Sequence, residues 1–142
     1  MSHFASDAEI ERIGLGLLDR SLPKLEWNHA AHFAAAFWLL RHPALCAQRD
    51  MPGLIRAYNE STGVANTDTT GYHETITLAS LRAARAWLAH RPAVKLNEAL
   101  NEMMLSNYGR SDWLLVHWSR PVLFSVAARR TWVGPDLQPL PF

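Results

Sequence analysis

The chain has 142 residues, of which 49% are hydrophobic and 19% are charged, and its formal net charge is +1 with histidine neutral. This length and composition predict a single folded domain over residues 1–142 and exclude an intrinsically disordered chain. No block of Lys or Arg stands out, so we expect neither nucleic acid nor a membrane surface as a partner.

Cysteine usage and the first residues indicate the compartment. The single cysteine, Cys46, excludes an intrachain disulfide and a structural zinc site built from several cysteines, and it suits a reducing compartment. The first residues lack the basic-then-apolar pattern of a secretory signal. The longest apolar run, residues 33–40, is far shorter than the ~20 residues that span a bilayer. We therefore expect a soluble cytoplasmic protein.

Two helices are predicted in the first part of the chain. The first begins with a capping box, in which Ser6 and Glu9 bind each other's backbone amides, and it ends before Pro23. The second begins after Asn28, a residue type that caps helix N-termini well, and it ends at Arg41.

The second predicted helix carries two histidines, His29 and His32, which are three residues apart. Side chains with this spacing lie on one side of a helix. They share that side with Phe33 and Phe37, so both imidazoles are predicted to face the core.

A third and a fourth helix are predicted in the middle of the chain. The third runs from about residue 54 to Gly63, which is expected to be a left-handed C-cap. A polar loop then leads to the fourth helix, which is predicted to begin at Thr70 or Gly71 and to end near His90.

The last third of the sequence predicts shorter elements. A fifth helix is expected over residues 94–106, and Ser111 or Asp112 is expected to cap a short sixth one. Ser125 is expected to cap a final turn. The segment from residue 133 onward has three prolines and is predicted to be extended along the body. The sequence thus predicts an all-α bundle of about five or six helices, with the second and fourth adjacent at its centre and an extended Pro-rich C-terminal segment.

Three histidines make up the first candidate site. His29, His32 and His73 are predicted to converge from the second and fourth helices and to bind a divalent metal such as zinc. Three nitrogen ligands with one open position form the arrangement that activates water. Glu74 would then be a fourth ligand or a catalytic general base.

A second interpretation of the same region needs no metal. His73 and Glu74 would be acid/base groups, or would bind a small polar ligand through hydrogen bonds. The other residues expected to contact that ligand are polar or aromatic and lie in the loops and helix starts around it. They are Trp27, Tyr58, Asn59, Asn66, Thr67, Tyr72 and Thr77.

A third interpretation gives the histidines structural roles only. Glu74, at the start of a helix, would complement the helix dipole or close a cap. Glu74 is rotated ~100° from His73 around the helix axis, which favours a capping role for Glu74 over a shared site. The protein would then act through self-association, as a homodimer, or through a protein partner. The residues leave open whether the chain is an enzyme.

Several strings of the sequence resemble a family of small bacterial helical proteins that has no characterised activity. The matching strings are Trp27–His32, Tyr58–Glu60, Gly63–Thr67 and Gly71–Thr75, of which the last is the most specific. The resemblance extends from about Trp27 to Leu140. It implies a single helical domain and adds weight to His29, His32, His73 and Glu74, but it implies no reaction.

Overall fold

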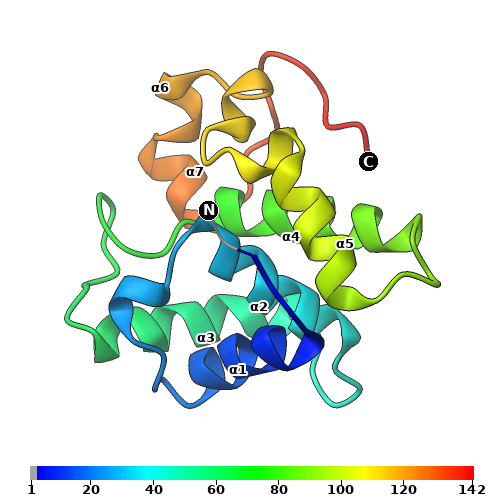
Figure 1. Cartoon of the computed structure of the whole chain (residues 1–142). Helices are drawn as coiled ribbons and strands as arrows, with labels where there is room; N and C mark the ends of the chain where they lie inside the picture. Colours follow the sequence, from blue (N-terminus) through cyan, green and yellow to red (C-terminus); the bar gives the residue numbers. More distant parts are fainter. Residues whose placement is uncertain (1–2) are drawn as a thin grey trace.

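A computed structural model of the chain describes residues 3–142, and the helical bundle predicted from the sequence is confirmed (Figure 1). These residues form seven α-helices and three short 3-10 helices, with no strand among them. The α-helices are α1 (Asp7–Leu18), α2 (His29–Arg41), α3 (Ala47–Ser61), α4 (Glu74–Ala89), α5 (Leu96–Leu105), α6 (Arg120–Leu123) and α7 (Val126–Arg130). The 3-10 helices are η1 (Lys24–Glu26), η2 (Asn107–Gly109) and η3 (Trp113–Val116).

Helix α2 lies at the centre of the bundle and packs against α1, α3, α4 and α5, so the predicted adjacency of α2 and α4 is confirmed (Figure 1). Its middle is fully buried, and the run Ala34–Ala36 lets neighbouring helices approach closely. Gly14 of α1 illustrates that closeness, because a Cβ built there would lie 2.2 Å from Cδ2 of Trp38. The core thus forms around one helix that has few polar side chains.

The caps of the first two helices differ in how well the sequence predicted them. The Asn28 side chain accepts from the amide of Ala31 at 2.9 Å, as predicted for an N-cap. The predicted capping box at Ser6 is wrong. The Ser6 side chain makes no cap bond, and the amide of Glu9 donates to the Ser6 carbonyl instead.

The fourth helix begins later than predicted, at Glu74, and His73 is its N-cap residue. The preceding loop closes on itself before this cap. Asn66 Oδ1 accepts from the amide of Tyr72 at 3.0 Å, and Arg129 of α7 donates to the carbonyls of Gly71 and Tyr72. The loop is therefore held between the body of the protein and α7.

Gly71 is required in this loop by both its conformation and its surroundings. Its φ is +77°, and a Cβ built on it would lie 2.5 Å from the Ala65 carbonyl oxygen and 2.7 Å from Asn66 Oδ1. We expect Gly71→Ala to lower the free energy of unfolding by about 2–3 kcal/mol, measured by urea denaturation. Gly63 is a matched control, since its φ is +85° but no atom lies within 4 Å of the Cβ site.

The control isolates the cost of backbone conformation. Gly63→Ala is expected to lose only about 1 kcal/mol, the cost of a left-handed conformation for a residue with a side chain. Equal losses in the two variants would contradict the role that we assign to the close contacts around Gly71.

The C-terminal third contains shorter elements than predicted. The expected sixth helix is the 3-10 helix η3, and Pro121 lies in the first turn of α6. The first turn tolerates proline because its amides have no partner within the helix. Ser125 caps α7, as predicted, by accepting from the amide of Ala128 at 3.1 Å.

The segment after α7 has no helix and follows the body, as its prolines predicted. The Trp118 indole donates to the Val133 carbonyl at 2.8 Å, and the amide of Ser119 donates to Asp136 Oδ1 at 2.8 Å. Thr75 of α4, which is fully buried, joins the same segment by donating to the Thr131 carbonyl.

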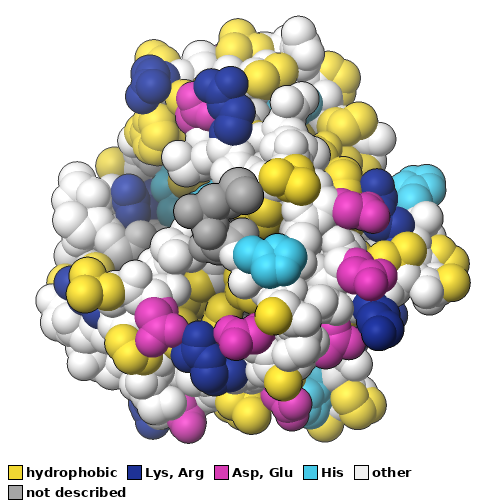
Figure 2. All heavy atoms as spheres, in the orientation of Figure 1, with side chains coloured by type: hydrophobic (Ala, Val, Ile, Leu, Met, Phe, Trp, Pro, Cys, Tyr) yellow, Lys and Arg dark blue, Asp and Glu magenta, His cyan; other side chains and the backbone are white. Residues whose placement is uncertain are grey.

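The surface drawn in Figure 2 carries basic and acidic side chains interspersed, without a block of one sign. Within residues 3–142, no helix combines the length and the apolar character that crossing a membrane requires.

Candidate ligand-binding cavity

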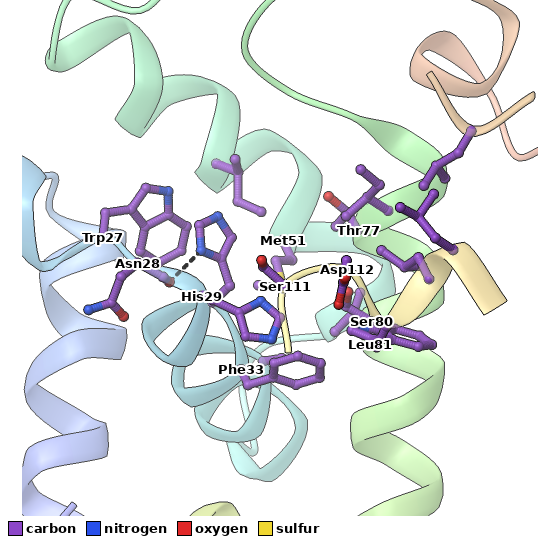
Figure 3. Close-up of a pocket in the computed structure, with 18 of the residues that line it drawn as sticks. Trp27, Asn28, His29, Phe33, Met51, Thr77, Ser80, Leu81, Ser111 and Asp112 are labelled. Carbon is purple, nitrogen blue, oxygen red and sulfur yellow. Dashed lines mark hydrogen bonds between the residues drawn. The ribbon is translucent and has the colours of Figure 1, made fainter. Parts of the chain in front are cut away.

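A cavity of about 430 Å³ lies between α2, α3, α4 and the segment over residues 111–124 (Figure 3). In the view of Figure 3, His29 and Phe33 of α2 lie on one side and Thr77, Ser80 and Leu81 of α4 on the other. The volume is within the range of pockets that bind small molecules, about 300–1,000 Å³.

Most of the cavity wall is apolar, with contributions from all four surrounding segments. Phe33 comes from α2, Met51 and Ile55 from α3, Leu81 from α4, and Leu123 from α6. Polar side chains are a minority on this wall. They include His29, His32, Thr77, Ser80, Asp112 and Arg120.

The two histidines of α2 are each held by one main-chain carbonyl. His29 Nε2 is 2.7 Å from the Tyr108 carbonyl oxygen, and His32 Nδ1 is 2.7 Å from the Asn28 carbonyl oxygen, a bond drawn dashed in Figure 3. A carbonyl oxygen only accepts, so the bound nitrogen of each ring carries the proton. In a neutral ring the other nitrogen is then a hydrogen-bond acceptor.

His32 is kept neutral by its surroundings. Its ring stacks on the Trp27 indole, with ring centroids 3.8 Å apart and planes inclined by 31°. Burial lowers the pKa of His32 to about 4, although the bond to the Asn28 carbonyl opposes the shift. The residue is partly exposed and lines the cavity. At neutral pH it therefore presents an uncharged acceptor.

His73 does not join the other two histidines. Its Nδ1 accepts from the amide of Ile76 at 3.2 Å, and its Nε2 donates to the Leu123 carbonyl at 2.7 Å. Both ring nitrogens are thus bound to main chain, and burial lowers the pKa of this ring. His73 is absent from the cavity wall, whereas Leu123, which it holds, is part of that wall.

The predicted convergence of three histidines is therefore not formed, because His73 is the cap of α4 and has no free nitrogen. Within residues 3–142, no three His, Cys, Asp or Glu side chains lie close enough together to hold a metal ion. His29 and His32 are brought to one cavity without a third ligand. The residues present do not fit a catalytic zinc site of three protein ligands.

Glu74, predicted as a general base, also lies outside the cavity wall. Its Oε1 accepts from the Tyr72 hydroxyl at 2.5 Å, and burial is the main cause that raises the pKa of Tyr72. The Arg56 guanidinium lies over the Tyr72 ring, 4.4 Å from its centroid. These three side chains form a cluster at the start of α4 that is separate from the cavity.

Of the residues predicted to contact a ligand, Trp27 and Thr77 line the cavity. The others do not, namely Tyr58, Asn59, Asn66, Thr67 and Tyr72. Tyr58 is fully buried beside Trp27, with ring centroids 5.3 Å apart, and its hydroxyl donates to the Leu22 carbonyl at 2.7 Å. Tyr58 therefore packs against Trp27, which is part of the cavity wall. Asn66 closes the loop before α4, as described above.

The largest part of the site that the sequence did not predict is the segment over residues 111–124. Ser111, Arg120 and Phe124 line the cavity from this side. The sequence there shows short helical signals and a proline but no pattern that indicates which face of the bundle it covers. Asp112 was predicted as a candidate helix cap, not as part of a cavity wall.

We compared the chain with family models, with curated proteins and with solved structures, and none of the three comparisons found a match.

Proposed function

We propose that this protein binds a small molecule in the cavity between α2, α3, α4 and residues 111–124. The ligand has an apolar body and at least one group that donates a hydrogen bond. This modifies the polar ligand expected from the sequence, because the wall is mostly apolar.

The observation that carries this proposal is the pair of histidines on the cavity wall. The protonated nitrogens of His29 and His32 are both bound by main-chain carbonyls, so the tautomer of each ring is set before a ligand arrives. When such a ring is neutral, its second nitrogen is left as an acceptor. Few polar groups, fixed in place on an apolar wall, are typical of small-molecule sites.

Binding can be tested with a neutral probe that has this chemistry, 4-phenylbutan-1-ol, by ligand-observed NMR and calorimetry. Ser80→Leu places extra volume in the cavity and is expected to weaken binding by about tenfold or more. Ala89→Leu is the matched control, because Ala89 is exposed on the same helix and lies outside the cavity. It is expected to bind the probe as the wild type does.

Ser80→Ala separates volume from polarity at this position. It removes the hydroxyl without filling the cavity and should keep the probe bound within about threefold of wild type. Absence of binding in the wild-type protein, or equal binding in the wild type and Ser80→Leu, would overturn the proposal.

A further inference from the structure

One arginine and one aspartate line the cavity on the side formed by residues 111–124, and they differ in their pairing. Arg120 lines the cavity, is exposed, and forms no ion pair with any of the residues 3–142. Asp112 is the one carboxylate on the wall within the same residues. Arg110 donates to both of its oxygens, with Nε 3.1 Å from Oδ1, and this bonding lowers the pKa of Asp112.

These pairings decide which charge a ligand could carry. The carboxylate of Asp112, which is the one carboxylate on the wall within residues 3–142, is already bound by the Arg110 guanidinium and is less available to a cationic ligand. Arg120 also lies near enough to Asp112 to help lower its pKa, but it forms no ion pair within residues 3–142. Arg recognises carboxylates through parallel N–H bonds. The wall therefore favours an anionic group on the ligand over a cationic one.

A second unpartnered donor lies on the same side of the cavity. Trp113 also lines it and is only 5% exposed. Its Nε1 is the single buried side-chain nitrogen or oxygen among residues 3–142 that has no hydrogen-bond partner. Buried donors are nearly always paired, so an orphan of this kind calls for an acceptor from water or a ligand. An oxygen atom of a ligand is a hydrogen-bond acceptor, which is the partner that the Trp113 indole lacks.

We propose that the ligand is a carboxylic acid with an apolar body, bound with its carboxylate at Arg120 and its body against the apolar wall around Phe33 and Leu81. This inference rests on the proposed function and adds the class of ligand to it. The histidines then accept from a donor elsewhere on the ligand, such as a hydroxyl group.

Three probes with one body and different head groups test the proposal at pH 7 and low salt. They are 4-phenylbutyrate, 4-phenylbutan-1-ol and 4-phenylbutylamine. We expect the butyrate to bind about three- to tenfold tighter than the alcohol, and the amine to bind more weakly than the alcohol. Adding 150 mM NaCl should weaken binding of the butyrate but not of the alcohol, because Arg120 is exposed and its attraction is screened.

Arg120→Gln should remove the preference for the butyrate over the alcohol. Arg41→Gln is the control, because Arg41 is also exposed and forms no ion pair among residues 3–142 but lies at the far end of α2. Equal affinities for butyrate and alcohol in the wild type, or an undiminished preference in Arg120→Gln, would overturn the carboxylate proposal while the binding function stands. If none of the three probes binds, both proposals fail.

Discussion

A His73→Ala variant is expected to lose about 2–4 kcal/mol of folding free energy, among the largest effects of a single substitution outside the apolar core. The alanine removes the cap of α4, which contributes about 0.5–2 kcal/mol. It also leaves the Leu123 carbonyl buried without its donor, at a cost of about 1–3 kcal/mol. His73 is 7% exposed, so water does not readily replace the ring. Urea denaturation of the two proteins measures the difference.

His73→Asn divides the two contributions. Asparagine is a good N-cap, so it should restore the bond to the Ile76 amide, but it is too short to reach the Leu123 carbonyl. We expect this variant to recover about 1 kcal/mol relative to His73→Ala. No recovery would show that the ring does not act as the cap of α4.

The same variant tests whether His73 belongs to the ligand site. Since the ring does not line the cavity, His73→Ala should change the affinity for 4-phenylbutan-1-ol by less than about threefold when the variant is folded. A tenfold loss in a folded variant would place His73 among the binding residues. A small loss would be explained by the contact with Leu123, which is on the wall.

The string Gly71–Thr75 therefore has a structural explanation for each of its residues. Gly71 adopts a left-handed conformation in a confined space, and His73 caps α4. Tyr72 is bound to Asn66 and Glu74, and Thr75 is bound to the segment after α7. The string that contains both predicted acid/base residues, His73 and Glu74, joins the loop, α4 and the C-terminal third of the chain.

The features that the sequence predicted are those set by neighbours along the chain. The caps at Asn28 and Ser125 each bind an amide three residues away, and the helical spacing of the apolar residues placed α2 and α4 face to face. The same spacing placed His29 and His32 on one side of α2, and the cavity lies on that side.

The features that it did not predict depend on partners far away in the sequence. His73 binds the carbonyl of a residue 50 positions later, and His29 binds one 79 positions later. Periodicity indicates that a histidine faces the core, but it does not indicate which segment covers it. The fourth wall of the cavity, over residues 111–124, is such a covering segment.

The stability of the protein should fall as the pH decreases from about 6.5 to about 4, because of His32. An unfolded histidine has a pKa near 6.5, whereas burial lowers the pKa of folded His32 to about 4. Between these values the unfolded chain binds a proton that the folded protein does not bind. The shift corresponds to a loss of about 3 kcal/mol over this window, with no further loss from this residue at lower pH.

His73 contributes in the same direction, since burial also lowers its pKa. The fall in stability should therefore shrink but not vanish in His32→Gln, as measured by urea denaturation from pH 7 to pH 4. An NMR titration of the His32 ring checks the cause directly and should give a midpoint near 4. A midpoint near 6.5 would contradict the burial of this ring against Trp27, and with it the neutral acceptor that the cavity offers a ligand at pH 7.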